Sequence, residues 1–215
     1  ESLKPHLPVA HNAAWRIRPY VVMAWGWWQA ARLAERDGLE ALPVSVGRRF
    51  VDRIEVLFQI GQLRAGDFDS LPGVGDLQAR VVDKGGYNFS TPDWETWHLK
   101  RRGQGSLMAP VSYGPSAKEG LGLGFLRSSA GLFAPVDEVM SAVLALNARL
   151  APALSHEAFS SLECGWVPLD EMEAWHPLWR MRDIADEEVA VGGDALLGRD
   201  AATPRGRTVR LVGSI

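Results

Sequence analysis

The sequence has little cysteine, and its longest uncharged apolar stretch is short. Cys164 is the only cysteine among 215 residues, which excludes an internal disulfide framework and suits a reducing cytoplasm. Residues 19–28 carry no charge, but these ten residues are too few to span a bilayer, which needs about 20. The two features together predict a cytoplasmic globular protein without a membrane partner.

The sequence also lacks a positive net charge, a starting Met and a signal peptide. The formal net charge is −3, which provides no overall attraction to nucleic acid. The first residues contain no apolar core segment, so no signal peptide is predicted. Because the chain does not begin with Met, we expect a fragment of a longer protein. Basic residues are 19 Arg and 4 Lys, a bias that suits bidentate contacts with phosphate or carboxylate groups.

What the sequence has in abundance is tryptophan, with nine residues of this type. Four of them occur at positions 15, 25, 27 and 28 within a segment whose apolar residues cover every helical direction. Such a pattern is typical of a helix buried on most sides. We therefore expect a central helix over residues 13–37, with Pro19 in its first turn or Asn12 as its N-cap, and with Gly38 ending it.

A second helix is predicted over residues 45–63. Its apolar residues recur at spacings of three and four, and the opposite side carries Arg48, Arg49, Asp52, Arg53 and Gln59. The pattern predicts an amphipathic helix whose arginines face solvent and are available to a phosphate backbone.

The segment Leu-Pro-Gly-Val-Gly at residues 71–75 resembles the hairpin of the helix-hairpin-helix family. The resemblance implies that Gly73 and Gly75 allow a tight turn, and that amides near the following helix hold a DNA phosphate. Asp76 opposes this reading because its charge repels a phosphate. The alternative is an ordinary glycine turn in which Asp76 caps a short helix over residues 76–83.

Residues 87–105 form a connector with a short predicted helix that starts at Thr91 and Pro92. Trp94 and Trp97 lie on one face of this helix, facing either the core or a partner. The basic run at residues 100–102 suits the C-terminal end of a helix dipole as well as it suits phosphate.

The remaining chain divides into a module and an acidic segment. Residues 106–152 predict two helices, over 117–125 and 136–150, which resemble a small winged-helix-like module without a visible strand pair for the wing. Residues 153–215 are acidic and Trp-rich, with a short helix over 169–175, solvated acidic residues at 186–188 and a mobile tail from 189 that includes an edge strand at 208–212. The predicted fold is therefore mainly α, with segments 1–105, 106–152 and 153–215.

A family resemblance covers much of the chain. Its elements are Arg-Ile-Arg-Pro-Tyr at residues 16–20, Arg-Phe-Val-Asp-Arg-Ile-Glu-Val-Leu at 49–57 and a Tyr-Gly-Pro segment at 113–115 followed by Leu-Gly-Leu at 121–123. This pattern is similar to an uncharacterised group of bacterial proteins from phage-defence gene neighbourhoods. Those proteins are typically longer, and the resemblance implies a defence context without implying any residue role.

No motif in the sequence predicts an enzyme, a metal or a cofactor. The five histidines lack the spacing of a zinc site, and Gly-Leu-Gly-Leu-Gly at residues 120–124 has no Lys-Ser/Thr of a phosphate loop. A nucleophilic pair of Cys164 with His156 or His176 remains as the third functional class.

The leading prediction is a non-enzymatic subunit of a bacterial assembly that contacts DNA or RNA. The alternative is a scaffold that docks a partner protein through its Trp-rich C-terminal half. The candidate nucleic-acid contacts are Arg16, Arg18, Arg48, Arg49, Arg53, Gly73, Gly75, Lys100, Arg101 and Arg102. The candidate partner contacts are Trp94, Trp97, Trp175 and Trp179.

Overall fold

The computed structural model describes residues 16–68, 71–119 and 122–197. Trp15, Asn12 and the edge strand predicted at 208–212 lie outside these residues. The described chain is mainly helical, as predicted, with two small two-stranded sheets. The α-helices are α1 (Arg18–Arg36), α2 (Val44–Arg64), α3 (Val74–Leu77), α4 (Pro92–Gln104), α5 (Gly114–Ala117), α6 (Met140–Leu150), α7 (Glu157–Ser160), α8 (Leu169–Trp175) and α9 (Asp186–Leu197). The strands are β1 (Gly86–Asn88), β2 (Leu126–Ser129), β3 (Leu132–Pro135) and β4 (Trp166–Pro168).

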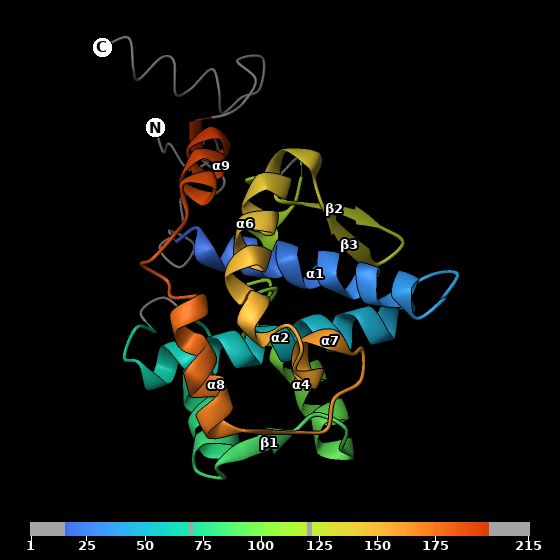
Figure 1. Ribbon diagram of the computed structural model, residues 1–215, viewed down its shortest axis with the longest axis vertical. Helices are drawn as coiled ribbons and strands as arrows, with labels where there is room; N and C mark the ends of the chain where they lie inside the picture. The colour runs from blue at the N-terminus through green and yellow to red at the C-terminus, as the bar shows by residue number, and fades with distance from the viewer. Residues whose placement is uncertain (1–15, 69–70, 120–121, 198–215) are drawn as a thin grey trace.

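Helix α1 is the central helix expected from the sequence, although it begins at Arg18. Pro19 occupies its first turn, and Gly38 follows its C-cap with a φ of +72°, a conformation that favours glycine. Trp25 is wholly buried, and almost every residue of the first three turns is buried with it. Figure 1 shows α1 stacked on α2 in the middle of the molecule.

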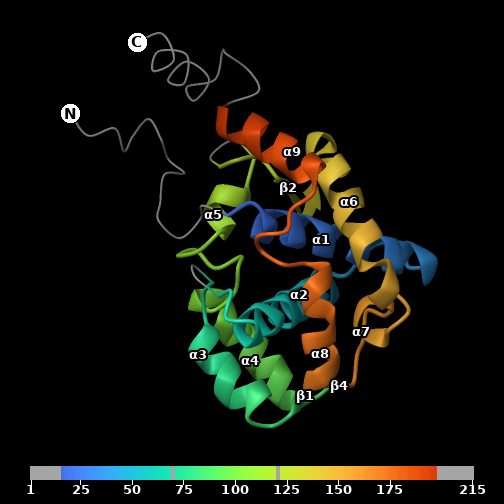
Figure 2. The ribbon, with the colours of Figure 1, turned by 60° about the vertical axis from the view of Figure 1, so that its left-hand side comes forward.

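Helix α2 matches its predicted range, but the amphipathic pattern expected for it is wrong. Asp52, Arg53, Glu55, Gln59 and Gln62 are all buried, so α2 has no fully polar outer face. The reason is tertiary, since α1, α4 and α8 enclose this helix (Figure 2). Each of these buried polar side chains forms a hydrogen bond with a group outside α2, although Nε of Arg53 and Oε1 of Glu55 have no partner among the described residues.

The later helices confirm some predictions and correct others. Helix α8 has the predicted bounds, and α6 with the preceding 3₁₀ turn (Asp137–Val139) covers the predicted 136–150 segment. The helix predicted over 117–125 is wrong, because α5 ends at Ala117 and the chain then enters the β2–β3 hairpin. The hairpin precedes α6 instead of following a helix pair, so the described residues do not form the winged-helix-like module.

The glycines of that segment explain the missing helix. An ideal Cβ on Gly122 would lie 2.2 Å from the carbonyl oxygen of Ser116, so only glycine fits this close backbone approach. Gly124 has a φ of +75°, which no helix accommodates.

The solvated acidic face predicted at 186–188 is confirmed for Asp186 and Glu187, which are exposed, but not for Glu188, which is buried. The mobile tail predicted from 189 is wrong over the described residues, because residues 186–197 form α9, which packs on α6. Glu188 is wholly buried against Arg18, and Gly192 lies against Ile17. These contacts join the end of the described chain to its beginning.

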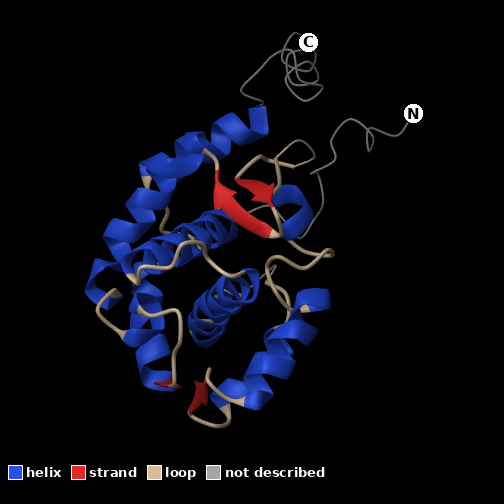
Figure 3. Cartoon of the chain, turned by 90° about the vertical axis from the view of Figure 1, so that its right-hand side faces the viewer, coloured by secondary structure: helices blue, strands red, loops and turns tan. Residues whose placement is uncertain are grey.

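The three segments predicted from the sequence contribute to one hydrophobic core. β1 pairs antiparallel with β4, with Tyr87 opposite Val167, and β2 pairs antiparallel with β3. Figure 3 shows these two strand pairs at opposite ends of the helical body. Within the described part of the chain, no helix combines the length and the apolar character needed to cross a bilayer.

Candidate nucleic-acid interface at the glycine hairpin

The glycine hairpin packs against the C-terminal end of α4. Gly73 is the N-cap of α3 and has a φ of +69°. An ideal Cβ at this position would lie 2.6 Å from the carbonyl oxygen of Gly105, so both the backbone conformation and the space require glycine. Gly75 has open space around it instead. The first glycine of the predicted motif is thus structural, and the second lies beside open space.

Gln59 fixes the hairpin to α4. Its Nε2 donates to the carbonyl oxygen of Pro72 at 3.0 Å, and its Oε1 accepts from Nη2 of Arg101. The same Nη2 donates to the carbonyl oxygen of Gly105 at 2.8 Å. Gln59 is wholly buried, so these bonds are protected from water and hold the turn and the helix end in one arrangement.

A hollow of about 700 Å³ opens where the hairpin meets α4, and we call it the hairpin hollow. The Lys100 side chain is exposed and has no bonding partner among the described residues. Arg101 is only 3% exposed, and its Nη1 has no hydrogen-bond partner in the same part of the chain. The lining residues are Gly73, Asp76, Lys100, Arg101, Gly103, Gln104 and Gly105.

Trp97 forms the support behind this hollow. Two guanidinium groups contact its ring, with Cζ of Arg80 at 5.3 Å and Cζ of Arg101 at 5.2 Å from the ring centroid. Its Nε1 donates to Asp76, whose other oxygen lies 3.3 Å from Nε of Arg80. Asp76 therefore does not cap α3, which corrects the alternative drawn from the sequence; it binds Trp97 and Arg80.

Two of the predicted phosphate contacts are buried inside the protein. Nη2 of Arg18 lies 2.8 Å from Oε2 of Glu188, with both side chains wholly buried. Arg53 donates to the carbonyl oxygens of Ser161 and Leu162, and burial lowers the pKa of its guanidinium to about 10. Neither arginine is available to a phosphate, so placing them on a basic surface was wrong.

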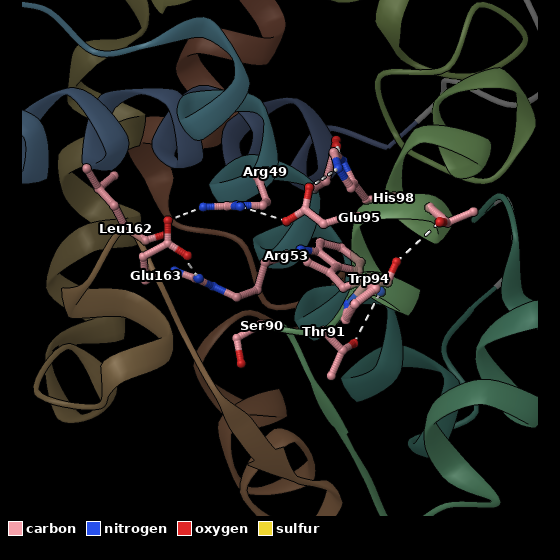
Figure 4. Close-up of polar contacts among 12 residues, drawn as sticks. Arg49, Arg53, Ser90, Thr91, Trp94, Glu95, His98, Leu162 and Glu163 are labelled. Atoms are coloured by element: carbon pink, nitrogen blue, oxygen red, sulfur yellow. Dashed lines mark hydrogen bonds and ion pairs between the residues drawn. The ribbon is translucent and has the colours of Figure 1, made fainter.

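The partly buried arginine Arg49 is engaged in a polar network between α2, α4 and the segment before β4. Its guanidinium lies between the carboxylates of Glu95 and Glu163 (Figure 4). Next to it, Nδ1 of His98 lies 2.8 Å from Oδ2 of Asp52. In this network Arg49 joins three parts of the chain, which is a structural role.

The other predicted arginines also have protein partners. Arg48 donates to the carbonyl oxygen of Gly131 at 3.0 Å, and Nη2 of Arg102 lies 2.7 Å from Asp52. Nη1 of Arg16 lies 3.7 Å from Asp67. Of the ten predicted nucleic-acid contacts, the structure brings together Gly73, Lys100 and Arg101 at the hairpin hollow.

The four tryptophans predicted to contact a partner are buried, so that prediction is wrong. Trp94 and Trp97 face the core with Tyr87 and Phe89, and Trp175 and Trp179 both pack on Phe159. Their hydrophobic area is used within the fold.

Three functional candidates were missed at the sequence level. Glu55 and Gln59 lie one turn apart on α2 and reach the region behind the hairpin hollow. Together with Asp52 and Gln62 they recur at spacings of three and four residues, which places all four polar side chains on one side of the helix. This spacing is the sequence pattern that could have indicated them. Trp166 is 52% exposed on β4, and no local pattern distinguishes it from the buried tryptophans.

The catalytic pairs considered for Cys164 are not formed among the described residues. Burial raises the pKa of the Cys164 thiol to about 11, which disfavours the thiolate needed by a nucleophile. Nε2 of His156 lies 2.7 Å from Glu171, and its Nδ1 accepts from the amide of Ala158. The described residues also contain no group of three or more side chains suited to a metal ion.

Comparison of the chain with protein families, with curated proteins and with solved structures found no significant match.

Proposed function

We propose that the protein is a non-enzymatic, nucleic-acid-associated subunit of a bacterial assembly, and that the hairpin hollow binds a backbone phosphate. The observation that carries this proposal is the wall of the hollow. There the free ammonium of Lys100 lies beside the incompletely bonded guanidinium of Arg101, next to a turn of helix-hairpin-helix type. Lys and Arg side chains are the usual phosphate ligands of proteins that bind nucleic acid.

The charges around the hollow support an anionic ligand. Arg101 has no carboxylate within ion-pair distance among the described residues, and its principal acidic neighbour is the buried Glu55, ahead of Asp52 and Asp76. Asp76 pairs with Arg80, and Asp52 pairs with Arg102. Neither Lys100 nor Arg101 forms an ion pair within the described part of the chain, and a phosphate would supply one while releasing counterions from the nucleic acid.

Binding at this site is expected to be largely independent of base sequence. The exposed ammonium of Lys100 would contact the phosphate, while the buried guanidinium of Arg101 adds its positive charge from the wall. Phosphate contacts position a nucleic acid without reading its bases. A glycine turn that lets its amides approach the nucleic-acid backbone closely also positions the ligand without reading its bases.

The proposal is tested by fluorescence anisotropy with labelled duplex DNA and single-stranded RNA at low salt. Lys100→Glu should weaken binding by roughly tenfold or more, because it replaces an attractive charge with a repulsive one. The matched control is Arg127→Glu, since Arg127 is exposed on β2, which lies at the other end of the molecule from α4 (Figure 1). Equal losses in the two variants, or no loss in Lys100→Glu, would overturn the proposal.

The cellular setting is part of the same proposal and has separate support. A cytoplasmic location is inferred from the single cysteine, and the phage-defence context is inferred from the sequence resemblance alone. Co-purification of the protein with its genomic neighbours tests the second inference.

A second candidate function, docking of a partner protein, is favoured by Trp166. Its ring is half exposed and covers Gly86, so β4 presents an aromatic side chain to solvent. If docking is the function, Trp166→Ser should abolish a protein complex that Lys100→Glu leaves intact. If nucleic-acid binding is the function, Lys100→Glu should abolish DNA or RNA binding and Trp166→Ser should leave it intact.

A further inference from the structure

A buried carboxyl group, that of Glu55, is the principal acidic neighbour of Arg101, which lines the hairpin hollow. Glu55 is wholly buried on α2, one turn before Gln59, which holds the guanidinium of Arg101. Oε2 of Glu55 accepts from the amide of Leu107 at 2.6 Å, and Met108 contributes a second backbone hydrogen bond. Oε1 has no hydrogen-bond partner among the described residues.

The charged groups that face Glu55 come from two helices. Asp52 lies one turn earlier on α2, and Arg101 approaches from α4; the segment after α4 contributes the two backbone amides. Asp52 itself is paired with His98 and Arg102. Burial and the charge of Asp52 raise the pKa of Glu55 to about 8, while the amides and Arg101 act in the opposite direction.

We propose that the protonation state of Glu55 controls how strongly the hairpin hollow binds a phosphate. Ionised Glu55 neutralises the charge of Arg101 from behind and leaves Lys100 as the main attractive charge. Protonated Glu55 leaves Arg101 fully cationic toward the hollow. This inference rests on the proposed function, because it assumes that the hollow binds phosphate.

The direction of the pH dependence follows from this arrangement. Below about pH 8 the carboxyl is protonated and phosphate binding is tighter; above that pH it ionises and binding weakens. Binding is reciprocal, so a bound phosphate favours the protonated form and the protein should take up protons on binding near pH 8. The backbone phosphodiester does not titrate in this range, so duplex DNA is a suitable probe.

The experiment measures the dissociation constant of the full chain for a labelled DNA duplex at pH 6.5, 7.5 and 9.0, at constant ionic strength. The variant Glu55→Gln keeps the shape of the side chain but cannot ionise. Affinity of the unmodified chain should fall roughly tenfold from pH 6.5 to pH 9.0, while Glu55→Gln should show a much smaller fall. All other ionisable groups are the same in the two proteins, so the difference between the two profiles isolates Glu55.

The outcomes separate this inference from the proposed function. Binding that requires Lys100 but has the same pH profile in Glu55→Gln would overturn the role of Glu55 alone. Absence of Lys100-dependent binding at every pH would overturn both. If Glu55→Gln does not fold, calorimetry of the unmodified chain in two buffers of different ionisation enthalpy replaces it. Net proton uptake near pH 8 then supports the inference, and its absence contradicts it.

Discussion

The guanidinium of Arg18 and the carboxylate of Glu188 lie 2.8 Å apart, with both side chains wholly buried. The pair connects the first turn of α1 to α9, near the two ends of the described chain. A buried ion pair depends on both partners, since removal of one leaves an uncompensated charge away from water.

Glu188→Ala should therefore lower the free energy of unfolding by about 3–5 kcal/mol. Chemical denaturation monitored by tryptophan fluorescence measures this change. The control is Glu173→Ala, which removes a partly exposed pair with Arg64 and should cost no more than about 1 kcal/mol. Similar, small losses in the two variants would show that α9 is not held through this pair.

Trp25 and Trp28 test the burial of α1. Trp25 is wholly buried, stacks edge-on against Phe159 and donates to Asn147, so Trp25→Ala should cost about 3–5 kcal/mol. Trp28 is only partly buried, with Arg32 over its ring, and Trp28→Ala should cost clearly less. Thermal and urea unfolding of the two variants measure the difference. Equal losses of unfolding free energy in the two variants would contradict the difference in burial between Trp25 and Trp28.

The hairpin offers a matched pair of glycine substitutions. Gly73→Ala should destabilise the protein by about 1–3 kcal/mol, because the residue has a positive φ and its Cβ would meet Gly105. Gly75→Ala should be neutral or stabilise by up to about 1 kcal/mol, since it adds a better helix former in open space. A comparable loss at both positions, measured by denaturation, would show that the turn has a different conformation.

Glu55 predicts how stability depends on pH. Its pKa rises from an ordinary value near 4.5 to about 8 on folding, so the folded state binds the proton more tightly. Its contribution is therefore complete below about pH 4.5 and is lost as the pH rises toward 8. Between pH 5 and 8 the unmodified chain should lose stability relative to Glu55→Gln, by an amount on the order of a few kcal/mol. Parallel pH profiles of unfolding free energy for the two proteins would contradict the burial of this carboxyl.

The main helices could be predicted because local signals determine them. The uncharged run of α1, with Pro19 in its first turn and Gly38 after its end, is a pattern that needs no tertiary information. Helix α4 likewise begins at Pro92, directly after its N-cap Thr91, whose hydroxyl accepts from the amide of Trp94.

The environment of α2 could not be predicted in the same way. Arg53 carries the periodicity of an exposed position, but the carbonyl groups that bind it come from Ser161 and Leu162, far along the chain. Helical periodicity separates polar from apolar faces without stating whether a polar face meets water or other polar groups. The burial of Glu188 is missed for the same reason, since its partner is Arg18.

The candidate site was predictable in part. The glycine motif and the basic run indicated Gly73, Lys100 and Arg101 as separate features. Their convergence on one hollow depends on Gln59, which bonds both the hairpin and Arg101 from within α2. No local pattern reveals such a connection.

The most direct test of phosphate binding at the hairpin hollow is the salt dependence of DNA affinity. Each phosphate neutralised on duplex DNA contributes about −0.9 to the slope of log K against log salt concentration. The unmodified chain should have a slope of about −1 for the one phosphate bound at the hollow, and Lys100→Ala should bring the slope close to zero. A slope near zero, or the same slope in Lys100→Ala, would contradict the central claim that this hollow binds a nucleic-acid backbone.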